Sequence, residues 1–184
     1  MIYHFSLYTI GLITGILLVV LSLLAIILPA DKFLPRFPRS RTAGATLLTI
    51  DLIWSFWLLA TMEMGEFAGF RRPLLIILPV GFFLVLRFVD EFLAVRALGI
   101  LYLLAAEPLL DAAFLRPETG HLLISVLAYV MIVEGLFWVT MPYLLRDLVN
   151  WSVRQTIRWR LMACFGLLYG AAILFCAFTR FPAS

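Results

Sequence analysis

Long apolar runs alternate with short polar connections along the whole chain. Helices of about 20 apolar residues are long enough to cross the hydrocarbon core of a bilayer. A membrane β-barrel would instead show strands of about ten residues in which polar and apolar side chains alternate. The pattern therefore predicts an all-α, polytopic transmembrane helical bundle, with apolar runs at 5–28, 42–62, 74–86, 93–110, 121–139 and 161–178.

A charged stretch in the middle of the chain decides the number of crossings. It contains no glycine or proline, and its four charged residues are Arg87, Asp90, Glu91 and Arg96. One helix over residues 74–110 would be about 55 Å long, whereas the hydrocarbon core is about 30 Å thick. Such a helix would also bury the four charges, at a cost of several kcal/mol. A tight turn at residues 88–90 avoids both problems and predicts six spans.

The residues of this turn also suit the start of the next helix. An aspartate such as Asp90 is a good N-cap, because its carboxylate accepts hydrogen bonds from free backbone N–H groups. Glu91 would then lie in the first helical turn, near the positive end of the helix dipole. We therefore expect Asp90 to cap the fourth span.

The basic residues predict the orientation of the six spans. Ten of them lie in or beside the connections after the first, third and fifth spans: Lys32, Arg36, Arg39, Arg41, Arg87, Arg96, Arg146, Arg154, Arg158 and Arg160. The opposite side has four: Arg71, Arg72, Arg116 and Arg180. Basic loops remain in the cytoplasm. Both termini are therefore expected on the outer side, which is the periplasm if the membrane is a bacterial inner membrane.

Composition agrees with this interpretation. Hydrophobic residues make up 64% of the chain and charged residues 14%, against about a quarter in ordinary globular domains. The mean hydropathy is +1.08. The basic residues are too few and too close to the membrane to indicate nucleic-acid binding. We expect one transmembrane domain over residues 1–184, built as three helical hairpins at about 5–62, 74–110 and 121–178.

Small residues recur where helices are expected to meet. An arginine precedes a small residue by three positions after each basic connection, in the pairs Arg41/Gly44, Arg96/Gly99 and Arg160/Ala163. This recurrence indicates either a three-fold hairpin repeat or chance. Two further pairs, Gly11/Gly15 and Gly166/Gly170, have the small-xxx-small spacing that lets a second helix approach closely.

A basic segment precedes the last span. Arg146, Asn150, Arg154 and Arg158 repeat every four residues between residues 143 and 160, so one helix would carry them on one face. The segment predicts an amphipathic helix lying in the membrane interface. With Arg160 it would attract anionic lipid, at about 1 kcal/mol for each basic residue near the surface. Orientation of the chain explains the same charges equally well.

Residues 122–180 carry a set of short motifs. They comprise Glu134-Gly135-Leu136, a following Pro142, a basic linker with Arg158 and Arg160, and a glycine-containing helix that ends at Arg180. This arrangement resembles the YjeT-like family of small two-helix bacterial inner-membrane proteins. It departs from the family in the longer linker and at Ala163, where the family has glycine. The resemblance implies a two-span unit and a bacterial membrane, and it implies no reaction.

Asp51 and Glu134 are the candidate site residues within the spans. An acid inside a membrane is costly, so it is by default a functional hypothesis. The alternative is that each carboxyl hydrogen-bonds a neighbouring helix and holds the bundle together. Glu107 lies near the outer end of its span, and we expect it at a solvated rim.

No recognisable catalytic motif or cofactor site is present in the sequence. His4 and His121 have no cysteine or carboxylate at ligand spacing, so no metal or haem is expected. The leading interpretation is a non-enzymatic scaffold or accessory subunit, with the bilayer and other membrane proteins or a second copy as partners. The alternative is a small transporter or channel that uses Asp51 and Glu134. A third is an enzyme acting on lipids at the interface.

The six-span topology can be tested at the central turn. A cysteine introduced by Asp90→Cys should react with a membrane-impermeant maleimide only from the cytoplasmic side, because the turn lies among the basic connections. Labelling of intact and inverted membrane vesicles measures this. Protection from both sides would exclude the six-span topology.

Overall fold

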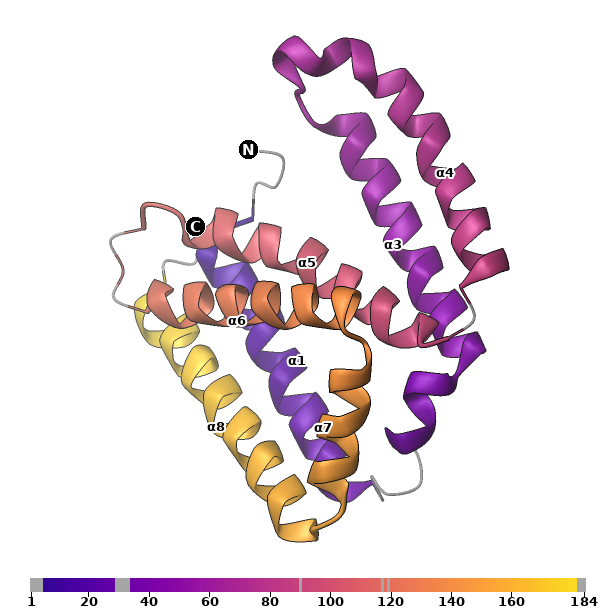
Figure 1. Ribbon diagram of the computed structural model, residues 1–184. Helices are drawn as coiled ribbons and strands as arrows, with labels where there is room; N and C mark the ends of the chain where they lie inside the picture. Colours follow the sequence, from indigo (N-terminus) through magenta and orange to yellow (C-terminus); the bar gives the residue numbers. More distant parts are fainter. Residues whose placement is uncertain (1–4, 29–33, 90, 117, 119, 182–184) are drawn as a thin grey trace.

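The computed structural model describes residues 5–28, 34–89, 91–116, 118 and 120–181, and they form an all-α protein (Figure 1). Its α-helices are α1 (Leu7–Ile27), α3 (Arg41–Thr61), α4 (Arg71–Phe88), α5 (Leu93–Ala113), α6 (His121–Thr140), α7 (Tyr143–Val153) and α8 (Thr156–Arg180). Two 3₁₀ helices, η1 (Leu34–Arg39) and η2 (Gly65–Phe70), precede α3 and α4. Six helices of the described chain are long and apolar enough to cross a membrane. The predicted polytopic bundle is confirmed.

The central reversal is also confirmed. α4 ends at Phe88 and α5 begins at Leu93, so the charged stretch is a turn between two spans. Phe92 precedes α5 with a left-handed φ of 57°, and its carbonyl oxygen accepts bonds from the backbone N–H groups of Val95 and Arg96. The expectation that Asp90 is the N-cap of the fourth span is wrong, because Phe92 holds the N-cap position of α5; Asp90 itself lies outside the described residues. The placement of Glu91 in the first helical turn is wrong, because α5 starts only after the chain has turned at Phe92.

α5 lies at the centre of the structure and packs against α6, α3 and α1. Its contact with α6 is made backbone to backbone. A Cβ atom added at Gly99 would lie 2.8 Å from the Gly135 carbonyl oxygen, and one added at Gly135 would lie 2.8 Å from that of Gly99. The largest buried cluster lies where α5 and α6 meet α1 and α8, and it includes Ile124 and Ile173.

The two predicted glycine pairs both lie in the contact between α1 and α8, where Gly15 faces Gly170. A Cβ atom at Gly15 would lie 3.2 Å from the Gly170 carbonyl oxygen, and one at Gly170 would lie 2.9 Å from Leu18 Cβ. A Cβ atom at Gly166 would lie 2.7 Å from the Ser22 hydroxyl oxygen. Close approach by small-xxx-small spacing is therefore confirmed, and it joins the first and last spans.

Successive spans run in opposite directions, but the helix pairs in most extensive contact are not those joined by the basic connections. The largest contacts join α5 to α6 and α1 to α8, followed by α3 to α5 and α3 to α4. The predicted hairpins at 5–62, 74–110 and 121–178 therefore describe which spans follow one another along the chain. The most extensive packing is between other pairs of helices. Local sequence predicts where the chain turns, but not which distant helix faces match.

α3 and α4 form an arm that extends from the rest of the molecule, at the upper right of Figure 1. The arm meets α5 near the start of α3, where a Cβ atom at Gly44 would lie 2.7 Å from the Ala94 backbone nitrogen. α4 itself has no buried residue. The arm therefore depends on α3 for its attachment.

The single amphipathic helix expected over residues 143–160 is wrong. α7 ends at Val153, and Gln155 adopts an extended conformation before α8 begins at Thr156. Arg158 and Arg160 therefore belong to the first turns of the last span. The Trp159 indole N–H donates to the Ala25 carbonyl oxygen at 2.6 Å, which fixes the start of α8 beside the end of α1.

The α5–α6 contact gives a matched stability test. Gly99→Ala should destabilise the protein by about 1–3 kcal/mol, because the added methyl group would lie 2.8 Å from a backbone oxygen of α6, so that the two helices would have to move apart. Gly81→Ala is the control, since a Cβ atom at this α4 position meets nothing within 4 Å. Unfolding in mixed detergent measures both variants. Equal stability of the two would contradict the close α5–α6 contact.

Candidate functional site

A pocket of about 1100 Å³ lies between the arm and the central helices. α3 and α5 touch at Gly44 and Ala94 near their starts, and the pocket is bordered by their later residues. Its apolar wall includes Trp57 of α3, Leu103 of α5 and Ile132 of α6. The arrangement leaves an open wedge at the membrane edge opposite the basic connections.

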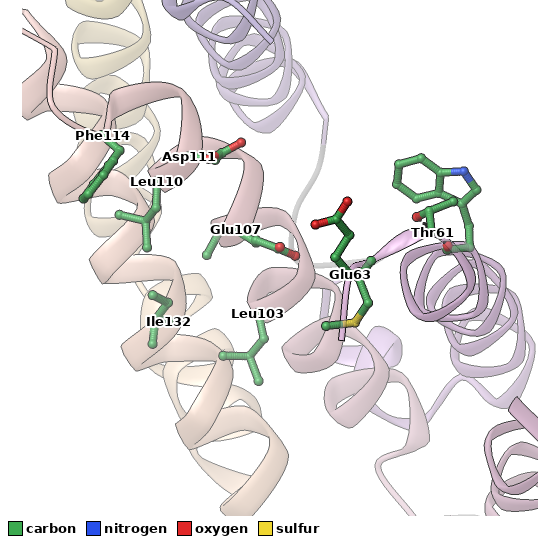
Figure 2. A pocket seen from close by; sticks show the side chains of 11 residues that line it. Thr61, Glu63, Leu103, Glu107, Leu110, Asp111, Phe114 and Ile132 are labelled. Atoms are coloured by element: carbon green, nitrogen blue, oxygen red, sulfur yellow. Dashed lines mark hydrogen bonds between the residues drawn. The ribbon is translucent and has the colours of Figure 1, made fainter. Parts of the chain in front are cut away.

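Three carboxylates line this wedge, and we call them the acidic rim: Glu63, Glu107 and Asp111. Glu107 and Asp111 are one turn apart on α5 and share a face. Figure 2 shows the Glu63 and Glu107 side chains extending toward one another across the space between the two walls. No salt bridge to any of the three is found within the described residues. The rim therefore brings three carboxyl groups to one pocket without an ion-pair partner among the described residues.

The sequence predicted only part of this rim. Glu107 is exposed, as expected for a solvated position. Glu63 and Asp111 lie just outside the predicted apolar runs 42–62 and 93–110, and the sequence predicts no site at either residue. The four-residue spacing of Glu107 and Asp111 was the signal that could have paired them. Nothing in the sequence indicates that Glu63, which follows α3, lies opposite them.

Asp51 lies deeper, on the α3 face that packs against α5. It follows Gly44 and Leu48 at helical spacing and is only 3% exposed. Neither of its carboxyl oxygens has a hydrogen-bond partner among the described residues. Asp51 does not line the pocket, and it precedes Trp57 of the pocket wall by six residues, or about 9 Å of helix rise. The hydrogen bond to a neighbouring helix, by which Asp51 would hold the bundle together, is therefore not found among the described residues.

Glu134 lies in a different part of the molecule. It is half-buried and lines a separate cavity of about 450 Å³ between α6 and α7, together with Trp138 and Trp151. α3 and α6 both pack on α5 but make no extensive contact with each other. The structure therefore does not bring Asp51 and Glu134 together, because each lies on its own side of the central helix.

The charged turn has a structural contact at its edge. The Arg41 guanidinium donates to the Leu86 carbonyl oxygen at 3.2 Å, which joins the start of α3 to the end of α4. Arg87 and Glu91 are exposed, and Arg96 is half-buried on α5. These positions connect the spans of the arm and the central helix, and they do not border the pocket.

The basic residues near α7 pack on aromatic rings. Arg146 forms an ion pair with Asp147 at 2.8 Å and lies 5.8 Å from the centre of the Phe92 ring. Arg158 lies 4.5 Å from the centre of the Trp151 ring, which joins α8 to α7. Arg154 and Arg160 are exposed. Arg146 therefore lies on α7, Arg154 in the bend, and Arg158 and Arg160 at the start of α8.

The acidic rim is not a metal centre of ordinary form. In the part of the chain that the structure describes, no group of three or more histidine, cysteine, aspartate or glutamate side chains could hold a metal ion together. The pocket is also large, and much of its wall is apolar. Its chemistry suits reversible binding of a positively charged molecule.

Comparisons with protein-family models, with curated proteins and with solved structures found no match. The resemblance of residues 122–180 to the YjeT-like family stays a prediction.

Proposed function

We propose that this membrane protein is a small carrier that binds a cationic solute between α3 and α5 and performs no covalent chemistry. The observation that supports the proposal most directly is Asp51, buried without a hydrogen-bond partner between the two helices that border the acidic pocket. The pocket supplies an entrance for a cation, and Asp51 supplies a carboxyl group farther inside the membrane.

A buried carboxylate without a partner is unstable. Removing one partner of a buried ion pair costs about 3–5 kcal/mol, since the remaining charge is left uncompensated. Asp51 is therefore stable in two states, either as the neutral acid or with a cation beside it. Alternation between these states couples the movement of a proton to that of a cation, which is how intramembrane acids act in many transporters.

Glu134 has no part in this route. Its cavity between α6 and α7 is separate from the pocket between α3 and α5. The transporter that the sequence suggested used Asp51 and Glu134. The carrier proposed here uses Asp51 and the acidic rim instead.

The orientation of the protein forms part of the proposal. Basic connections in the cytoplasm would place the acidic rim on the outer side, the periplasm of a bacterial inner membrane. Arg146, Arg154, Arg158 and Arg160 would then meet anionic lipid on the cytoplasmic surface. A cation would enter from the outer side, where the pocket is open.

The carrier mechanism is tested by replacing Asp51. Asp51→Asn keeps the shape of the side chain but cannot exchange a proton, so we expect at least a tenfold loss of cation-driven proton movement. Proteoliposomes with a trapped pH-sensitive dye measure it under gradients of Na⁺, K⁺ and benzyltrimethylammonium. Glu134→Gln is the matched control, since it also removes a carboxyl from a span but lies outside the pocket.

The same preparation separates folding from transport. Both variants should elute as single species and unfold near the wild-type midpoint. Full proton movement by a folded Asp51→Asn protein would refute the carrier mechanism.

A second candidate function is that of an accessory subunit, and α4 favours it. None of its residues is buried, and its outer surface carries exposed Ile76, Val80 and Phe83. Lipid can cover such a surface, but a helix of a partner can also pack there. This candidate does not need Asp51 or the pocket.

Photo-crosslinking distinguishes the two candidates. If α4 is an interface, a photoreactive amino acid in place of Phe83 should give one discrete protein adduct in native membranes. The same replacement at Ile13, which is 56% exposed on α1, is the control. A lipid adduct alone at both positions would exclude the α4 interface.

A further inference from the structure

The pocket between α3 and α5 has two kinds of wall, and their combination limits what can bind there. The carboxylates of the acidic rim approach from the end of α3 and from α5. Trp57, Leu103 and Ile132 supply the apolar surface. A ligand that satisfies both walls needs a positive charge and an apolar body.

The size of the pocket is the first argument against a bare inorganic ion. Its volume of about 1100 Å³ compares with about 30 Å³ for one water molecule in the liquid. Pockets for drug-sized ligands range from about 300 to 1000 Å³. A single metal ion would leave most of this space to water against apolar side chains.

The placement of the carboxylates is the second argument. Glu107 and Asp111 are separated by one helical turn, about 6 Å of rise, and Glu63 belongs to the opposite wall. Within the described residues these groups do not form a set that could hold a metal ion. Separate carboxylates around a wide space suit a diffuse charge, such as an alkylated ammonium group, better than a small ion that requires several close oxygens.

The aromatic wall is the third argument. The indole of Trp57 is the kind of ring that attracts organic ammonium groups by the cation–π interaction. Apolar parts of the same ligand would gain by leaving water for contact with Leu103 and Ile132. Removing the water also strengthens the attraction between the ammonium group and the rim.

We infer that the pocket between α3 and α5 binds an amphiphilic organic cation, an ammonium group attached to an apolar body. The inference rests on the proposed cation carrier and names its substrate class. Binding in the outer pocket needs the acidic rim but not Asp51, which does not line the pocket. The two proposals can therefore fail separately.

Isothermal titration of the full chain in nanodiscs tests the inference. The probes are benzyltrimethylammonium, tetramethylammonium with the charge alone, benzyl alcohol with the aromatic body alone, and Na⁺ or Mg²⁺. We expect saturable binding of benzyltrimethylammonium that is at least tenfold tighter than that of tetramethylammonium and absent for benzyl alcohol. High salt should weaken the binding, because the rim is partly exposed.

Substitutions assign this binding to the pocket. The double variant Glu107→Gln with Asp111→Asn should weaken benzyltrimethylammonium binding at least tenfold. Glu66→Gln is the matched control, because Glu66 is an exposed carboxylate at the same end of the molecule that does not line the pocket.

The outcomes separate the two proposals. Rim-dependent binding of Na⁺ or Mg²⁺ without binding of benzyltrimethylammonium would overturn the substrate class and leave the carrier function standing. Binding of benzyltrimethylammonium that the double variant does not change would also overturn the inference. Rim-dependent binding of the organic cation without any Asp51-dependent proton movement would support the inference and refute the carrier.

Discussion

The backbone contact between Gly99 of α5 and Gly135 of α6 is the interaction on which the rest of the structure depends. Apolar side chains in a bilayer gain little by leaving lipid for one another, so helices associate where small residues let them come close. This contact fixes α6 against α5, and the remaining faces of α5 then receive α1 and α3. The glycine pairs of α1 and α8 add a second close contact that holds the last span.

The candidate site exists because α3 and α5 pack closely at one end only. Gly44 lets the start of α3 approach α5, and Asp51 is enclosed in this contact. Farther along, the side chains between the two helices are large, as Trp57 and Leu103 show, and the walls enclose an open space. Close packing at one end and a pocket at the other thus place one carboxyl inside the membrane and three at its edge.

Asp51 and Glu134 show what can and cannot be predicted from the residues next to them in the sequence. Each interrupts an apolar run, and this alone identifies Asp51 and Glu134 as costly within a membrane. Their surroundings differ because different helices pack on them. Asp51 is buried on α3 without a hydrogen-bond partner among the described residues, whereas Glu134 lies beside a cavity between α6 and α7. The acidic rim shows the converse, since Glu63 becomes part of a site only when α3 is placed opposite α5.

The sequence by itself determined the all-α class, the six spans and the central turn. The reason is that the length and polarity of each run are local properties, and they decide whether that run can cross the hydrocarbon core as a helix. It also identified Gly15, Gly44, Gly99 and Gly170 as small residues where helices meet, but it gave no such role to Gly135. Only the tertiary structure decided which helices pair, that the basic segment bends at Gln155, and that Glu63 joins Glu107 and Asp111 in one pocket. These features depend on contacts between side chains far apart in the chain, so they cannot be predicted from any one segment alone.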